Sequence, residues 1–290
     1  MLARQTDAVG LRVAEKRPRH WTPEFCVSLG VVGGAILLAV AAPLVAPYSP
    51  TAIAADAFAH PSAAHLFGTD QLGRDILSRV IYGTRLSLGT AGFAVLTSGL
   101  VGIVLGLFAG YFGGWLDSVV MRAMDIVFAF PAILLAMGLV AIMGAGAASG
   151  AIAIAVVGVP AFARLARAGM LVEREKPYVE AVRALGASDL RIIFGAVLPN
   201  TIGPLIVQAG IGATLAVLLQ ASLSFLGLGP PPPAPSWGEM LSQSRSVLYQ
   251  APWYGVFPGL ALTAVVLALN AIADGLQRFP RFGSGPTLGG

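Results

Sequence analysis

An uncharged stretch in the first half of the chain reads Leu86-Ser-Leu-Gly-Thr-Ala-Gly-Phe-Ala-Val-Leu-Thr-Ser-Gly-Leu-Val-Gly-Ile-Val-Leu-Gly-Leu-Phe-Ala-Gly110. A helix rises about 1.5 Å per residue and the hydrocarbon core of a bilayer is roughly 30 Å thick, so about 20 apolar residues cross it. We therefore predict a transmembrane helix over 86–110. Further apolar runs predict spans at 25–46, 124–144, 150–169, 204–226 and 256–274.

The composition also favours the bilayer as solvent. Of the 290 residues, 56% are hydrophobic and 11% are charged, whereas soluble globular proteins carry about 25% charged residues. The isoelectric point is near 9.6, but the basic residues flank the apolar runs and form no patch for nucleic acid. The single Cys26 can form neither an internal disulfide nor a metal site. The sequence predicts an all-α membrane protein with six transmembrane helices.

The positions of Lys and Arg predict the orientation. With the N-terminus in the cytoplasm, 14 of the 18 basic residues lie on the cytoplasmic side, as the positive-inside rule requires. This places both termini and the 170–203 loop in the cytoplasm. We expect cytoplasmic tails at 1–24 and 276–290, a first span at 25–46, extracytoplasmic loops at 47–85 and 227–255, and a core membrane domain at 86–275.

The two outer loops contain apolar and aromatic residues that suggest contact with the membrane surface. Ile76, Leu77, Val80 and Ile81 have helical spacing, which predicts an amphipathic helix lying on the bilayer. Trp237, Trp253 and Tyr254 fit an interfacial aromatic belt.

Several residues inside the spans have two interpretations. Gly102 and Gly106 line one helix face, either for close packing or for a contact that slides during transport. Pro131 and Pro160 remove backbone donors and should kink their helices, and Pro160 is a candidate gating position. Polar side chains within apolar spans either join helices or line a water-filled pathway; these are Gln208, Gln220 and Asn270.

Missing motifs argue against chemistry on this chain. It has no Gly-x-x-x-x-Gly-Lys-Ser/Thr loop for ATP phosphates, no His-Glu-x-x-His zinc motif and no Gly-x-Ser-x-Gly nucleophile elbow. Carboxylates deep inside the spans, which ion-driven carriers need, are also missing. We expect a non-catalytic conduit without metal or cofactor.

A polar interruption, Tyr178-Val-Glu-Ala-Val-Arg-Ala-Leu-Gly-Ala-Ser-Asp-Leu-Arg-Ile-Ile-Phe-Gly-Ala-Val-Leu-Pro199, separates two spans. Pro177 suits a helix start, and Gly186 suits a left-handed C-cap. One apolar stripe is predicted at Tyr178, Ala181, Val182 and Leu185. A second helix should begin at Ser188, carry the stripe Leu190, Ile193, Phe194 and Val197, and end at Leu198-Pro199. Either the lipid surface, the chain's own helical bundle or a partner protein must cover the two stripes.

This segment resembles the Glu-Ala-Ala loop of permease subunits in bacterial ABC importers. Glu180, Ala181, Gly186, Leu198 and Pro199 match that pattern in register, and Val182 replaces its second Ala. The resemblance implies a coupling helix that seats in a groove of a separate ATP-hydrolysing subunit. It thus implies ATPase-coupling roles for Tyr178, Glu180, Ala181, Val182, Leu185, Gly186, Leu198 and Pro199.

Most of the chain is similar to the C-type permeases of dipeptide and oligopeptide importers, through five further motifs in the same order. They are Phe67-Gly-Thr-Asp-Gln-Leu-Gly-Arg-Asp75, Gly110-Tyr-Phe-Gly-Gly-Trp115, Ser224-Phe-Leu-Gly-Leu-Gly229, Pro235-Ser-Trp-Gly238 and Ala251-Pro-Trp253. The resemblance implies a type I importer fold in the bacterial cytoplasmic membrane. It also implies four kinds of partner: a second homologous permease, two ATP-binding subunits that hold ATP and Mg, an extracytoplasmic peptide-binding protein, and membrane lipid.

Other functions remain open from the sequence. Nickel-importer permeases share much of the pattern, so the substrate could be nickel or another small solute. A stand-alone secondary carrier is disfavoured by the missing intramembrane acids and by the docking segment. A non-transport membrane scaffold is disfavoured by the kinked, glycine-rich spans.

Overall fold

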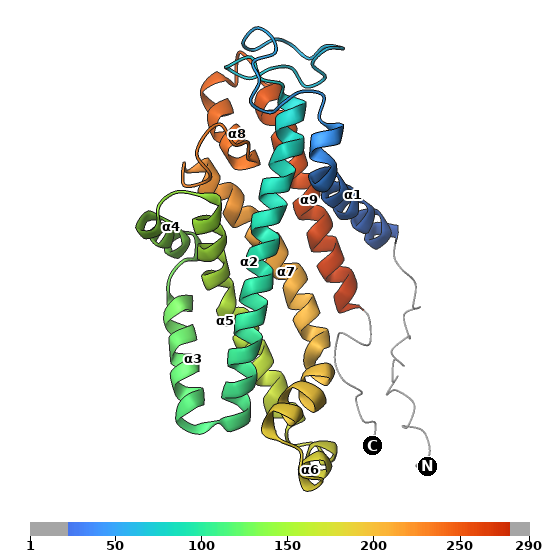
Figure 1. The fold of residues 1–290 in the computed structure, drawn as a ribbon, viewed down its shortest axis with the longest axis vertical. Helices are drawn as coiled ribbons and strands as arrows, with labels where there is room; N and C mark the ends of the chain where they lie inside the picture. The colour runs from blue at the N-terminus through green and yellow to red at the C-terminus, as the bar shows by residue number, and fades with distance from the viewer. Residues whose placement is uncertain (1–22, 279–290) are drawn as a thin grey trace, which may run out of the picture.

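The computed structural model describes residues 23–278, so the predicted tails at 1–24 and 276–290 lie almost entirely outside it. The described part is a helical bundle whose long axis follows α2, α5 and α7 (Figure 1). In chain order its helices are α1 Pro23–Val45, α2 Ile76–Phe112, α3 Gly114–Ala129, α4 Ala132–Met143, α5 Ala147–Glu173, α6 Pro177–Ala184, the π-helix η1 Arg191–Val197, α7 Leu198–Phe225, α8 Trp237–Ser244, the 3-10 helix η2 Arg245–Val247 and α9 Trp253–Gln277.

The predicted fold class is confirmed. Within residues 23–278, five stretches are long and apolar enough to cross a membrane: α1, α2, α5, the continuous helix Arg191–Phe225, and α9. The pair α3 and α4 makes a sixth if its two halves are counted as one broken span.

The third span differs from the prediction of one kinked helix over 124–144. α3 begins ten residues earlier, at Gly114, and meets α4 at a bend of 96°. Phe130 is extended, with φ −94° and ψ 139°, because the ring of the following Pro131 disfavours the helical region for the residue before it. Pro131 then serves as the N-cap of α4. At Pro160, in contrast, α5 continues as one helix.

The predicted surface helix in the first outer loop is wrong. Residues 76–85 form the first turns of α2, a single helix of 37 residues that starts from an Asp75 cap. Ile76 is completely buried, and it packs with Val80, Met240 and Tyr254 in one cluster. These apolar positions therefore face protein and not lipid.

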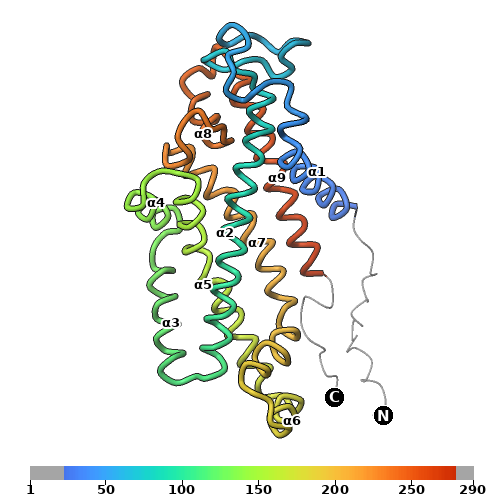
Figure 2. The backbone as a smooth tube through the Cα atoms, viewed as in Figure 1, coloured from blue at the N-terminus to red at the C-terminus, as the bar shows by residue number. Residues whose placement is uncertain are grey.

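The two predicted outer loops meet at one end of the bundle, opposite α6 (Figure 2). We call residues 46–75 together with 227–252 the cap. Trp237 is 1% exposed and its indole Nε1 donates a 3.1 Å hydrogen bond to the Val80 carbonyl. Tyr254 is also fully buried. Neither residue belongs to a lipid-facing aromatic belt, because each fills the joint between the cap and α2.

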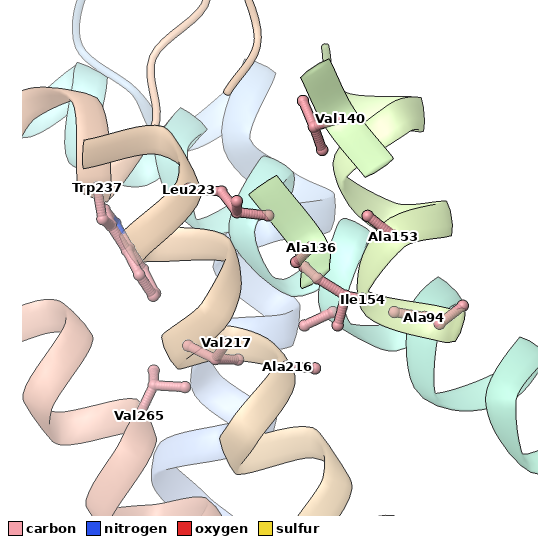
Figure 3. Close-up of a cluster of buried hydrophobic side chains, with 12 residues drawn as sticks. Ala94, Ala136, Val140, Ala153, Ile154, Ala216, Val217, Leu223, Trp237 and Val265 are labelled. Carbon is pink, nitrogen blue, oxygen red and sulfur yellow. The ribbon is translucent and has the colours of Figure 1, made fainter. Parts of the chain in front are cut away.

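Small residues allow the central helices to pack closely. The main cluster combines Ala94 of α2, Ala136 of α4, Ala153 and Ile154 of α5, and Val217 of α7 (Figure 3). Closer to α6, a Cβ on Gly102 would lie 2.6 Å from the Val159 carbonyl oxygen. Lipid provides no hydrophobic driving force between helices, so the van der Waals contact that this close approach gives helps to hold α2 and α5 together.

Candidate coupling surface

The segment between α5 and α7 lies at the end of the bundle, where α6 projects beyond the long helices (Figure 1). α6 begins as predicted, with Pro177 in its first turn and the extended Lys176 as N-cap. Val179 is fully buried and packs in one cluster with Ile192 and Ile193 of η1. This contact anchors a helix of only eight residues.

A buried carboxylate fixes α6 relative to α5. Glu173, 8% exposed at the end of α5, accepts hydrogen bonds from Lys176 Nζ at 2.6 Å and from the Tyr178 hydroxyl at 2.7 Å. Asn200 Nδ2 donates to the same hydroxyl at 3.3 Å. Burial, and then the bond to Glu173, raise the pKa of Tyr178 to about 12. The phenol is therefore a protonated donor at all physiological pH values.

The far end of α2 is tied to the same region. Tyr111 donates a 2.6 Å hydrogen bond to Asp189, at the start of the helical segment that leads into η1. Arg174, just beyond α5, donates from Nη1 to the Gly110 carbonyl at 2.8 Å. Three long helices, α2, α5 and α7, thus contact the α6 segment through specific polar bonds.

The turn after α6 depends on glycine, as predicted. Gly186 has φ +79°, a left-handed conformation that L side chains disfavour. Its N–H bonds to the Arg183 carbonyl at 2.9 Å, and the Ala187 N–H bonds to the Val182 carbonyl at 3.3 Å. A Cβ at Gly186 would meet nothing within 4 Å, so backbone conformation alone requires the glycine.

The outward side of this segment exposes apolar residues beside charged ones. We call its exposed residues Glu180, Ala181, Leu185 and Leu190 the α6 surface. The side chains of Leu185 and Leu190 are 88% and 57% exposed. Among the described residues Glu180 has no ion-pair partner. The apolar stripe predicted for α6 is divided. Tyr178 and Val182 are half-buried and turn inward, whereas Ala181 and Leu185 are exposed.

The predicted stop at Leu198-Pro199 is wrong. Helical structure continues from η1 through α7 without a break. Pro199 falls in the first turn of α7, directly after the π-helical turns, where its missing N–H and fixed φ are tolerated. The second half of the coupling segment is thus continuous with the helix of the fifth span.

The residues predicted for helix contact or pathway lie apart from the α6 surface. Gly102 and Gly106 are buried against α5, the geometry of close packing. Gln220 is 5% exposed and donates from Nε2 to the Ser224 hydroxyl at 3.0 Å. Gln208 is half-buried and Asn270 is exposed on α9. The structure does not bring these three polar residues into one site.

A second polar cluster lies in the cap and was missed by the sequence reasoning. Asp70 accepts a 2.7 Å bond from Arg74 Nε, and Arg79 lies 3.5 Å from the same carboxylate and 3.8 Å from Glu239. Arg79 is completely buried. Burial raises the pKa of Glu239, and the positive charge of Arg79 partly opposes this rise. The charged residues of the motif at 67–75 could have indicated this cluster. Asp70 of that motif holds the cap against α2 through its ion pair with Arg79.

Ion pairs also join α3 to α5. Arg167 pairs with Asp117 at 2.5 Å, and Arg164 pairs with Asp125 at 2.7 Å. Asp125 thus binds across to α5. Within residues 23–278, no group of His, Cys, Asp and Glu side chains could hold a metal ion.

The fold, the broken third span and the projecting segment before α7 define a membrane permease of the ABC importer class. The chain belongs to the family of binding-protein-dependent transport system inner membrane components, whose model matches residues 102–280. It is therefore a multi-pass protein of the bacterial inner membrane.

Relatives include three permeases with known names. A dipeptide transport system permease of Alkalihalophilus pseudofirmus is 46% identical over 87% of this chain and 83% of its own length. A di/tripeptide transport system permease of Pseudomonas aeruginosa is 44% identical over 89% and 90%. A glutathione transport system permease of Pectobacterium atrosepticum is 47% identical over 75% and 72%.

The fold is also similar to that of a chain in the methionine ABC transporter MetNI, in an inward-facing conformation. The TM-score is 0.57 at 21% identity, and the match covers 69% of this chain and 94% of the other. This likeness shows the shared fold.

Proposed function

We propose that this chain is the permease subunit of an importer for di- and oligopeptides, driven by separate ATP-hydrolysing subunits that dock on the α6 surface. The observation that carries this proposal is the exposure of Leu185 and the unpaired Glu180 on a firmly anchored segment. Apolar groups exposed beside a charge suit a partner interface better than lipid or bulk water.

The positive-inside distribution supports an orientation with α6 and both termini in the cytoplasm. The cap then faces outward, where an extracytoplasmic peptide-binding protein delivers its cargo. A second, homologous permease completes the pathway, and two ATP-binding subunits lie beneath. ATP and Mg are held by those subunits, and this chain contributes no catalytic group or cofactor.

Short peptides are the substrate class that the relatives favour. Their names specify dipeptides, di/tripeptides and glutathione, which all carry peptide bonds and free carboxylates. This range favours peptide over nickel for a chain of this similarity. Much of the selectivity would lie with the binding protein.

The contacts around α6 suggest how movement is passed on. Closure of the ATP-binding subunits would shift α6, and the Glu173–Tyr178 bond would move α5 with it. The continuous helix from η1 to α7 would carry the same shift to the fifth span. Differential binding of the ATPase to the two states then drives alternating access.

Co-purification tests this proposal. The tagged chain, extracted in mild detergent, should bring down ATP-binding subunits and a second permease. Glu180→Lys should lower peptide uptake roughly tenfold or more, because a reversed charge at a docked interface is costly. Gly186→Leu should do the same through strain in the left-handed turn. Thr263→Ser, at an exposed residue of α9 whose hydroxyl donates to the Gly259 carbonyl of the same helix, is the control.

Normal uptake by both variants at normal subunit abundance would contradict the role of the α6 surface. Recovery of a lone chain that still transports would instead favour a secondary carrier.

A further inference from the structure

We propose that Arg85 and the two apolar grooves beside it form a binding site for a diacyl phospholipid, with the phosphate on the guanidinium and one acyl chain in each groove. This site does not depend on the identity of the transported solute. It lies on α2, between α1 and α5.

Arg85 is an exposed cation inside a candidate membrane span. It has no ion pair or hydrogen bond with any other residue in the described range 23–278. A charged side chain at membrane depth is costly unless it meets an opposite charge or reaches the polar interface. An anionic group from outside the chain, at the level of the lipid phosphates, would meet both conditions.

One groove runs between α2 and α5. It has a volume of about 560 Å³, and Leu86, Phe93, Ala151 and Ile152 give it an apolar wall. The other groove, between α2 and α1, has a volume of about 340 Å³ and is lined by Ile36, Ala39, Val40 and Leu88. Arg85 and Gly89 line both grooves.

The depth of Arg85 suits a lipid headgroup. It follows Ile76, the first residue of α2, by nine residues, or about 14 Å of helix. The adjacent Val40 lies five residues before the end of α1, about 8 Å along that helix. A helix of 23 residues such as α1 is about as long as the hydrocarbon core is thick. If α1 spans the core, Arg85, beside Val40, lies within about 8 Å of the border of the core, measured along α1. A long arginine side chain can reach the phosphates from there.

A phospholipid fits this geometry better than a peptide does. It joins one phosphate to two apolar chains, as one arginine joins two apolar grooves. Neither groove is lined by an acidic side chain that could hold a peptide amine. Thr90, one of the few hydroxyl groups present, already donates to the Leu86 carbonyl at 2.9 Å.

The test uses the detergent-extracted assembly reconstituted with phosphatidylglycerol. Native mass spectrometry would count the lipid molecules retained on this subunit. Arg85→Gln should weaken retention roughly fivefold, the effect of one basic residue near an anionic lipid. Gly89→Leu should displace the acyl chains, because a Cβ there meets no protein atom within 4 Å and the side chain would fill the grooves.

Two matched controls keep the result interpretable. Gly92→Leu lies one turn further along α2, also with open space around its Cβ, and should retain lipid. Arg245→Gln removes an exposed arginine of the cap and should retain it as well. Unchanged retention in both Arg85→Gln and Gly89→Leu would overturn the site. A raised KM for peptide in Arg85→Gln with lipid retention unchanged would do so too, and would assign Arg85 to the substrate.

Discussion

The hydroxyl of Tyr178 and the carboxylate of Glu173 are joined by a 2.7 Å hydrogen bond across the break between α5 and α6. The carboxylate is buried at the end of a candidate span, and the phenol lies in the first turn of α6. A bond to a charged acceptor is stronger than a neutral one. The orientation of α6 relative to α5 is therefore fixed by this contact as well as by the burial of Val179.

Removing the phenol oxygen should loosen this joint. Tyr178→Phe is expected to lower the free energy of unfolding by about 1–3 kcal/mol, because the buried carboxylate loses one of its donors. We expect fewer peptides transported per ATP hydrolysed while the subunits still assemble. Parallel measurements of uptake and ATPase activity in proteoliposomes would check this, with Tyr249→Phe at an exposed tyrosine as control.

The raised pKa of Tyr178 should make the stability of the folded protein depend on pH in the alkaline range. Its folded value of about 12 exceeds the ordinary 10.0, so the folded state holds this proton more tightly than the unfolded state. The resulting stability is complete below pH 10 and is lost as pH rises toward 12. Thermal melts across this range should show a decline that Tyr178→Phe lacks; equal slopes in both proteins would contradict the assignment.

Because α2 packs closely on α5, replacing two different glycines of α2 by alanine should have very different effects on stability. A Cβ at Gly106 would overlap the Ala163 carbonyl oxygen, whereas a Cβ at Gly99 would lie 3.6 Å from the Phe162 ring, an ordinary contact. Gly106→Ala should therefore cost about 1–3 kcal/mol by overpacking. Gly99→Ala should be nearly neutral. Similar melting temperatures for the two variants would contradict a close contact between Gly106 and the Ala163 carbonyl.

Gln220 allows a distinction between helix contact and pathway. Its Nε2 is bonded to Ser224, while its Oε1 has no hydrogen-bond partner. Gln220→Met should leave stability unchanged or raise it, since an unsatisfied buried acceptor is removed. Ser224→Ala should cost about 1–3 kcal/mol by leaving the amide unpaired. If Gln220 lines the pathway instead, Gln220→Met will reduce uptake with stability unchanged.

Glu239 should make the stability of the folded protein depend on pH in the acidic range. Burial raises its pKa above the ordinary 4.5, so from pH 4.5 up to the raised value the folded state binds more protons than the unfolded state. Stability should fall as pH increases through this window. Glu239→Gln should remove that fall, as followed by thermal melts from pH 4 to 7. Glu175→Gln, at an exposed carboxylate, should leave it in place.

The sequence predicted the spans because each must be apolar over a whole bilayer thickness. It also predicted the Pro177 start and the Gly186 turn, since both follow from local backbone limits. It misjudged α3 and α4, where Pro131 produced a 96° break and not a kink. Proline removes the same backbone donor in either case, and neighbouring helices determine whether the chain bends or continues, as it does at Pro160.

Local patterns alone thus established a helical membrane protein with a glycine-capped segment outside the bilayer, because these features depend on residues near one another in the chain. Tertiary contacts were needed to turn Ile76 and Trp237 inward, to bury Arg79 beside Glu239, and to leave Leu185 exposed. Whether a side chain of a short amphipathic helix faces protein, lipid or a partner depends on elements up to 157 residues away in the chain, as for Trp237 and Val80. The spacing of apolar residues does not contain that information.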